Sequence, residues 1–499
     1  MRRAAVRAWR WLEADPQRAL LLTIAAMLLI RAPFLWRPLE ADEGGFLLVA
    51  DQWHGAGTSL YGDQWVDRPP LLLLVFKVAA AWGGSSVVVH LFAAAFNTVL
   101  ICAAWWVGRI INGGKGAVAA AVVAAVAGSN IMVGGLALTG ELMAGTLVMV
   151  SCALILQARY RSESPLAALG LAVAAGIFAA MAFLVKQNFI DAGLFGFALL
   201  VLKPRETWKL MVSFGAGVVA PLAVTAIWAE SDSGPGLGNL WDALFRFRSH
   251  AFDIVAHSGS KAPLIRFELL ILIFVVSGML FLSWQLVVAC RRVEHMRSVR
   301  LAVLVMWLYG VAGILVGASW WRHYLIALIP ALAIGTALAT RREARRLHTH
   351  YAATLAVAAA AAATLVGLVW QLAGHVPHYD DQQVAAYLRE ASSANDGVFL
   401  AYGAPDVIWK AGLHAPYRYS WSLPMRARDP HLQHLVSTLR GPDAPTWLVE
   451  MGDFDWWGID NAAFEAVRAD RYHRVATVCG HDVYLLDGVV RTNPPVPTC

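Results

Sequence analysis

The run AATLAVAAAAAATLVGLVW, residues 352–370, carries no charged side chain over its whole length. Because a helix rises 1.5 Å per residue, a run of this length can cross a hydrocarbon layer about 30 Å thick. Residues 270–289, LILIFVVSGMLFLSWQLVVA, form a second such run. A backbone inside lipid must satisfy its own hydrogen bonds, and no alternation typical of a β-barrel is seen. These runs are therefore expected to be transmembrane helices.

Similar runs recur along the chain, which is 58% hydrophobic and 15% charged. Soluble chains are nearer half apolar and about a quarter charged. The pattern predicts about eleven spans: 19–36, 86–108, 116–134, 141–157, 166–185, 188–202, 210–229, 267–290, 301–318, 323–340 and 352–373. No small-residue cleavage site follows the first apolar run, so it is expected to be retained as a span. The shorter apolar segment 69–82 is expected to be a half-buried helix.

The net charge of +6 is explained by membrane topology and gives no reason to expect nucleic-acid binding. Basic residues concentrate in alternate connections between the spans. Examples are Arg109, Lys115, Arg159, Arg161, Arg291 and Arg292. Under the positive-inside rule these connections are cytoplasmic, as is the N-terminus. An odd number of spans then places the chain after residue 374 on the outer face of the cell membrane.

The chain changes character at this point, which divides it into a membrane module, 1–374, and an extracytoplasmic domain, 375–499. Strand-like runs are predicted at 397–402, 446–451 and 481–486, and helices at 380–392, 431–440 and 462–469. Strands alternating with helices predict a small α/β domain. The expected fold is thus a polytopic α-helical membrane protein with a C-terminal α/β domain.

The long outer loop 230–266 interleaves aromatic and charged residues from Leu240 to Ile254. This pattern predicts a helix lying in the membrane interface, with Trp and Phe towards lipid and charge towards water. A plain connecting loop is the alternative.

The first outer loop contains the sequences LEADEGGF, residues 39–46, and YGDQWVDRPPL, residues 61–71. Asp42 and Glu43 lie just beyond the first span, where charge is costly unless it is used. Taken alone, they are more simply interpreted as solvated loop charges. Asp67 and Arg68 precede two prolines, which fix the direction of the chain and hold an acid and a base side by side.

This combination of an Asp-Glu pair followed by acid, base and Pro-Pro-Leu resembles the membrane glycosyltransferases of the GT-C class. It is most similar to the dolichyl-phosphate-mannose protein mannosyltransferases and the lipid A aminoarabinose transferases. The first group has His before Pro-Pro; Arg68 is nearer the Lys of the second. The resemblance covers 15–345 by layout, and its specific motifs lie in the first loop.

The resemblance implies a polyprenyl-phosphate sugar donor that reacts with inversion at the outer face, with a glycan, lipid or protein as acceptor. It implies Asp42 as the base that activates the acceptor. Glu43 and Asp67 would shape the site or help to hold a divalent cation such as Mg²⁺ or Mn²⁺. Arg68 would belong to the residues that bind the donor phosphate.

Further site residues are expected where spans meet the outer surface. Glu141 would contact a metal or the acceptor, or it is simply an acid at a helix N-terminus. Lys186 would bind the lipid phosphate, or it is a snorkelling anchor. Arg322, His323 and Tyr324 open a Pro-containing span as in the family and would grip the phosphate, although an aromatic interface belt would look the same.

No P-loop, dinucleotide-binding turn or metal-binding helix motif is found, so no nucleotide cofactor is expected. Two other classes remain open: a transporter or flippase, and a glycan ligase or polymerase that uses a lipid-diphosphate donor. The sugar and the acceptor cannot be read from the sequence.

Two of the five cysteines, Cys479 and Cys499, lie in the tail, and the other three fall within predicted spans. An outer location permits oxidation. A polar terminus would fray unless tied down, and Asp487-Gly488 followed by prolines turns the chain back. We therefore expect a Cys479–Cys499 disulfide, with a free terminal thiol as the alternative.

Overall fold

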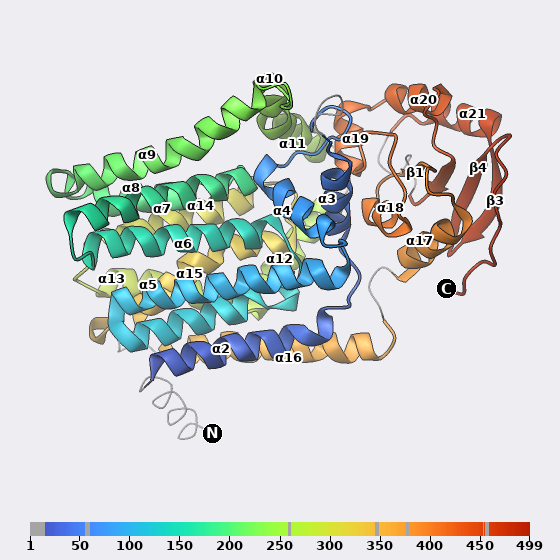
Figure 1. Cartoon of the computed structure of the whole chain (residues 1–499). Helices are drawn as coiled ribbons and strands as arrows, with labels where there is room; N and C mark the ends of the chain where they lie inside the picture. The colour runs from blue at the N-terminus through green and yellow to red at the C-terminus, as the bar shows by residue number, and fades with distance from the viewer. Residues whose placement is uncertain are drawn as a thin grey trace.

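The computed structural model describes residues 15–54, 60–257, 261–344, 349–375, 379–452, 454 and 459–499. The N-terminal residues predicted to be cytoplasmic lie mostly outside this range. Figure 1 shows two parts: a bundle of helices lying alongside one another, and an α/β domain at one end of it, next to α3 (Ala41–Gln52). We call residues 379–499 the tail domain.

The bundle is built from the apolar runs of the sequence. Its principal helices are α2 (Pro16–Arg31), α4 (Pro70–Ala81), α5 (Ser86–Gly128), α6 (Gly140–Tyr160), α7 (Pro165–Val185), α8 (Asp191–Val201), α9 (Pro204–Ala229), α12 (Ala262–Val276), α13 (Met279–Arg292), α14 (Arg297–Val316), α15 (Ile329–Ala339) and α16 (Thr349–Leu372). Short turns η1 (Ala32–Phe34), η2 (Ile131–Val133), η4 (Arg322–Leu328) and η5 (Arg342–Ala344) join some of them. The chain is therefore a polytopic helical membrane protein, as predicted, and α4 matches the expected short helix.

Each of the eleven predicted ranges contains an apolar helix, but the helices differ in length. Among the described residues, seven are long and apolar enough to cross a membrane on their own. An eighth is the pair α12 and α13, bent by 65° at its break. Helix α8 and the apolar part of α16 are shorter.

Helix α5 holds two of the predicted spans in one hairpin. Asn112 and Gly113 have non-helical backbone angles, with φ of Gly113 at 59°. This value is favourable for glycine and strained for other residues. The chain turns back so closely that a Cβ added to Gly108 would lie 2.2 Å from the Gly116 carbonyl oxygen. Glycines thus allow the two halves to pack backbone to backbone.

The second outer loop is helical, which confirms the predicted helix over the plain loop. It consists of α10 (Leu237–Trp241), a π-helical turn η3 (Asp242–Arg246) and α11 (Phe247–His257). However, its aromatic side chains do not all face lipid. Phe247 is fully buried against Trp65, with ring centroids 4.7 Å apart, whereas Trp241 and Phe252 are exposed. Part of the face predicted to enter lipid is protein core instead.

The tail domain is a four-stranded sheet with helices. Its elements are α17 (Tyr379–Ala391), β1 (Val398–Ala401), α18 (Pro405–Ala411), α19 (Ser422–Arg428), α20 (Gln433–Arg440), β2 (Trp447–Glu450), α21 (Ala462–Arg471), β3 (Tyr472–Val478) and β4 (His481–Leu486). The strand order is β1-β2-β4-β3; β1 and β2 are parallel and the other pairs antiparallel. The three predicted strands and three predicted helices are present. The sequence did not predict β3, α18 or α19.

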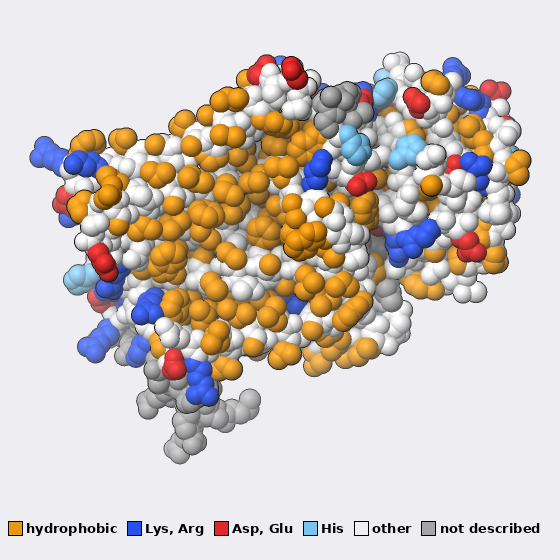
Figure 2. Space-filling view, in the orientation of Figure 1, with side chains coloured by type: hydrophobic (Ala, Val, Ile, Leu, Met, Phe, Trp, Pro, Cys, Tyr) orange, Lys and Arg blue, Asp and Glu red, His pale blue; other side chains and the backbone are white. Residues whose placement is uncertain are grey.

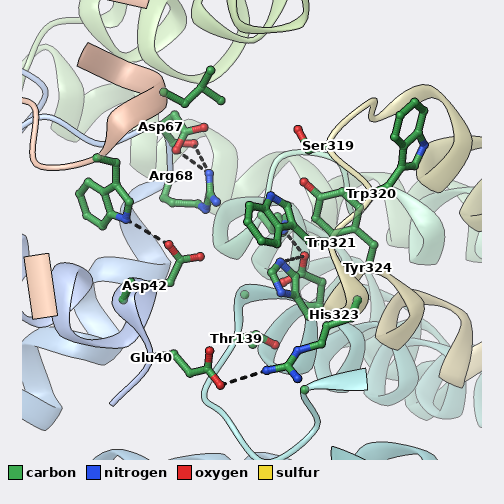
Figure 3. A pocket seen from close by; sticks show the side chains of 18 of the residues that line it. Glu40, Asp42, Asp67, Arg68, Thr139, Ser319, Trp320, Trp321, His323 and Tyr324 are labelled. Carbon is green, nitrogen blue, oxygen red and sulfur yellow. Dashed lines mark hydrogen bonds and ion pairs between the residues drawn. The ribbon is translucent and has the colours of Figure 1, made fainter. Parts of the chain in front are cut away.

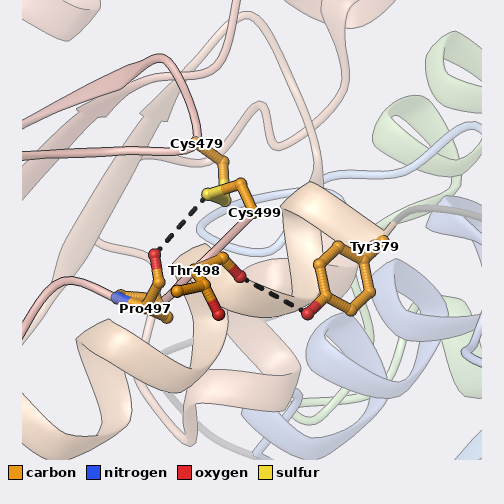
Figure 4. Close-up of a disulfide and its surroundings, with 5 residues drawn as sticks. All are labelled: Tyr379, Cys479, Pro497, Thr498 and Cys499. Atoms are coloured by element: carbon orange, nitrogen blue, oxygen red, sulfur yellow. Dashed lines mark hydrogen bonds between the residues drawn. A yellow bond between two sulfur atoms is a disulfide. The ribbon is translucent and has the colours of Figure 1, made fainter.

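The C-terminal segment is tied to the tail domain at several points. Cys479 and Cys499 form a disulfide, with Cα atoms 5.5 Å apart (Figure 4). Tyr387 donates a hydrogen bond to Asn493, and Arg491 pairs with the buried Asp396 at 2.6 Å. The segment therefore does not depend on the disulfide alone to stay in place.

Candidate active site

A cavity of about 570 Å³ lies at the end of the bundle that meets the tail domain. It is lined by the first turn of α3, the start of α6, η4, α11, the start of α12 and the α19 region. Figure 3 shows Asp42 and Arg68 on one side of it and Trp320, Trp321, His323 and Tyr324 on the other. All the residues predicted for the site, apart from the two cysteines, line this cavity.

The first turn of α3 is held by Glu43. This side chain is 1% exposed; its oxygens accept hydrogen bonds from the Glu40 and Leu138 backbone N–H groups, at 2.9 and 2.6 Å. His90 lies 3.6 Å away. Burial raises the pKa of Glu43, but the charge and hydrogen bond of His90 outweigh it and lower the pKa below its usual value. Glu43 therefore caps α3 and ties it to the segment before α6.

Asp42 is the next residue in the same turn, and its surroundings differ. It is half-buried and lines the cavity. Its Oδ1 accepts a hydrogen bond from the indole N–H of Trp421 at 3.1 Å (Figure 3). No cationic side chain forms an ion pair with it among the residues described. Asp42 is thus a carboxylate that faces the cavity and is held by a neutral donor.

Asp67 and Arg68 are locked together at the start of α4. The two prolines do what the sequence predicted: Pro69 is the N-cap and Pro70 the first helical residue. Asp67 pairs with Arg68 and with Arg248, both at 2.5 Å. Burial raises the pKa of Asp67, but Arg248 and then Arg68 outweigh it and lower the pKa below its usual value. Asp67 is therefore ionised at neutral pH and already neutralised by two guanidinium groups.

The start of α6 contributes a second buried pair. Glu141 and Lys186 form an ion pair, with side chains only 3% and 7% exposed. The Nε2 atom of His323 lies 3.6 Å from Glu141, and the Lys186 ammonium lies 5.1 Å from the centre of the Tyr324 ring. Lys186 therefore points into the protein and is no snorkelling anchor.

Arg322 lies at the rim. It is 42% exposed and forms an ion pair with Glu40 at 3.3 Å, and Glu40 is also paired with Arg37.

One further cation, Arg266, does not take part in these ion pairs. Its guanidinium lies over the Trp321 ring at 4.4 Å, and its buried Nε has no hydrogen-bond partner. Arg266 makes no ion pair with any described residue and lines the cavity.

The acids do not assemble into a metal site. No three His, Cys, Asp or Glu side chains among the described residues lie close enough together to hold a metal ion. Glu43 is bound by backbone N–H groups, Asp67 by two arginines and Glu141 by Lys186. The predicted metal set of Glu43, Asp67 and Glu141 therefore does not fit a cation.

Sequence reasoning missed three residues of the cavity. Arg266 carried a signal, because a charge at the start of an apolar span is costly unless it is used. Arg248 lies on the predicted loop helix but was not assigned to the site. Trp421 carried no signal, since only the docking of the tail domain brings it to Asp42.

No protein-family model and no curated protein matches the chain, but solved structures do. ArnT from Cupriavidus metallidurans in the apo state has a TM-score of 0.60 at 15% identity, covering 93% of this chain and 97% of that chain. ArnT bound to undecaprenyl phosphate has a TM-score of 0.58 at 16% identity, with the same coverage, 93% and 97%. The Archaeoglobus fulgidus oligosaccharyltransferase in complex with Zn and sulfate has a TM-score of 0.56 at 13% identity, covering 87% and 67%.

These neighbours are GT-C glycosyltransferases, the class that the outer-loop motifs resemble. At such low identity the likeness concerns the fold, and it extends over the tail domain as well as the bundle. The chain has the GT-C fold.

Proposed function

We propose that this protein is an inverting glycosyltransferase. It moves a sugar from a polyprenyl-phosphate donor to a glycan, lipid or protein acceptor at the outer face of the membrane. The observation that carries the proposal is Asp42, a carboxylate that makes no ion pair with any described residue and faces a cavity also lined by Arg68, Lys186 and Arg266.

Asp42 would act as the general base. A sugar or lipid hydroxyl is too weak an acid to attack unaided at neutral pH, and a carboxylate can take its proton as the new bond forms. The hydroxyl oxygen attacks the anomeric carbon, and the bond from that carbon to the phosphate oxygen breaks. The electron pair leaves with the polyprenyl phosphate, and a single displacement inverts the anomeric centre.

The departing phosphate gains negative charge, which the cations of the cavity would stabilise. Arg266 is the best placed by its chemistry, because no carboxylate of a described residue neutralises its guanidinium. Arg68 and Lys186 form ion pairs with Asp67 and Glu141, so their positive charge is partly neutralised and they would stabilise the phosphate less strongly. Guanidinium groups suit phosphate because they can donate two parallel hydrogen bonds.

The proposed orientation has its own support. Figure 2 shows a largely hydrophobic bundle surface, with Lys and Arg gathered at the end far from the tail domain. The positive-inside rule makes that end cytoplasmic. The cavity and the tail domain would then face outwards, where a disulfide is stable.

The test is transfer by the purified full chain in vesicles. Radiolabelled polyprenyl-phosphate sugars are compared with polyprenyl-diphosphate glycans, with a cell-envelope extract as acceptor. We expect label to move to the acceptor from a monophosphate donor, with release of polyprenyl phosphate. Transfer only from diphosphate donors would identify a ligase or polymerase, and movement of the lipid across the vesicle without transfer would identify a flippase.

A further inference from the structure

The tail domain packs against the loops of the bundle at glycine residues, where a larger side chain would clash. A Cβ added to Gly44 would lie 2.4 Å from the Asp406 Cα atom, and one added to Gly45 would lie 2.3 Å from the Trp421 ring. At Gly84 the obstacle would be the Trp409 ring, also at 2.3 Å. The Gly-Gly pair that follows Asp42 and Glu43 therefore makes room for the tail domain.

Several contacts besides the one to Asp42 hold Trp421 in place. It is the N-cap residue of α19, and its ring packs on Phe46 with centroids 5.7 Å apart. At the other end of α19, Arg428 pairs with Asp242 at 2.5 Å and so binds the helix to the second outer loop. The indole N–H then meets the Asp42 Oδ1 atom at 3.1 Å.

We propose that Trp421 is a positioning residue for the base: it holds one oxygen of Asp42 and leaves the other directed at the acceptor hydroxyl. The inference rests on the proposed function and deepens it. A neutral donor fixes the rotation of the carboxylate without forming an ion pair with it. The tail domain is then part of the catalytic unit and not an appended module.

The same segment would form the acceptor side of the cavity. Tyr402, Ser422, Leu423 and Arg426 of the tail domain line the cavity together with Trp421. Arg266 and Lys186, the cations suited to the donor phosphate, come from the bundle. An acceptor bound beside Asp42 would therefore contact side chains of the tail domain, several of them aromatic or polar.

The test compares two substitutions of the same kind at the same interface. Trp421→Phe keeps an aromatic ring and removes the N–H donor to Asp42. Trp409→Phe removes the other indole bond across the interface, from Trp409 Nε1 to the Gly84 carbonyl oxygen at 3.1 Å, away from the cavity. We expect Trp421→Phe to lower kcat about tenfold with an unchanged donor KM, because a hydrogen bond to a charged group is lost. Trp409→Phe should stay within about twofold of the wild type.

An equal loss in both variants would show that Trp421 only helps docking, and no loss in either would show that it has no role. A second measurement does not depend on transfer. A hydrophobic carbodiimide modifies protonated carboxyl groups, and peptide mass spectrometry reports the labelling of Asp42. Without the N–H donor, the Oδ1 atom of Asp42 is no longer held, so Trp421→Phe should label several-fold faster, and Trp409→Phe should match the wild type.

Equal labelling of all three proteins would overturn the inference even if transfer is observed. A wild type that transfers from no donor but shows the labelling difference would instead contradict the proposed function and leave the positioning contact standing.

Discussion

Two acidic regions of the cavity use a carboxylate group in opposite ways. At the start of α6, Glu141 is buried and paired with Lys186, and His323 is close by. At the start of α3, Asp42 is half-buried and touches only the neutral indole N–H of Trp421 among the polar groups described. A carboxylate matched by a cation is stabilised as an anion and is a poor proton acceptor. Under the proposed function, Glu141 stabilises the walls of the cavity and Asp42 is the residue that accepts the proton.

The largest effect is expected at Asp42. Asp42→Asn keeps the size of the side chain and removes the proton acceptor, so turnover should fall about a hundredfold to ten-thousandfold. Transfer in vesicles measures it, with Asp63→Asn, an exposed acid of the same outer loop, as control. Turnover of Asp42→Asn close to the wild type would break the comparison, because the base would then lie elsewhere.

The Glu141 region should respond through stability. Lys186→Met leaves the buried Glu141 carboxylate without its cation, and removing one partner of a buried pair destabilises by about 3–5 kcal/mol. Thermal unfolding in detergent should show a marked loss. The double variant Lys186→Met/Glu141→Gln should recover much of it, since no unpaired charge remains. If the double variant is no more stable than the single one, the pair is not the support inferred here.

Removing the tail disulfide tests whether the Asp42 region depends on the stability of the whole tail domain. Its two cysteines are 20 positions apart, and closing this loop should contribute about 3 kcal/mol in the loop-entropy model. Cys499→Ser should therefore lower the unfolding temperature of the tail domain, while kcat stays near that of the wild type because Trp421 is untouched. Mass spectrometry of the unreduced protein should first find the two cysteine peptides linked. Rapid alkylation of both thiols without reductant would contradict the disulfide and the outer location.

Two cations of the cavity, Arg266 and Arg322, can be compared in the same way. If the unpaired guanidinium binds the donor phosphate, Arg266→Ala should weaken donor binding about tenfold, through loss of a charge-assisted hydrogen bond. Arg322→Ala, which removes a rim cation already paired with Glu40, should have the smaller effect. Titration with polyprenyl phosphate measures both, and the reverse order would transfer the phosphate role to Arg322.

The smallest effect is expected from chelation. Arginine and lysine already neutralise Asp67 and Glu141, so these acids are not free to bind a cation. Exhaustive treatment with EDTA should leave the transfer rate unchanged. A loss of activity that Mg²⁺ or Mn²⁺ restores would show that a metal displaces one of these pairs when substrate binds.

The sequence predicted which residue types gather at the outer surface, but not how they pair. Lys186 follows α7 whereas Glu141 lies in the first turn of α6, and Asp67 precedes α4 whereas Arg248 lies on α11. Nothing in their spacing along the chain indicates these ion pairs. For this reason the sequence could not show that each acid of the predicted metal set is already bound by other groups, and that set stays a prediction. The role of Glu43 as a cap for α3 was open to prediction, since an acid three residues after the N-cap is a known capping pattern.

The sequence by itself determined the membrane class, the apolar helices, the α/β character of the tail and the position of the acidic motif. These follow from hydrophobic runs, short-range periodicity and proline, which act over a few residues. Only the tertiary structure decided that Arg266 has no carboxylate partner among the described residues and that Trp421 meets Asp42. Trp421 and Asp42 are 379 positions apart, and their contact depends on the glycines of α3 and on how the tail domain docks. Local patterns carry no information about such long-range packing.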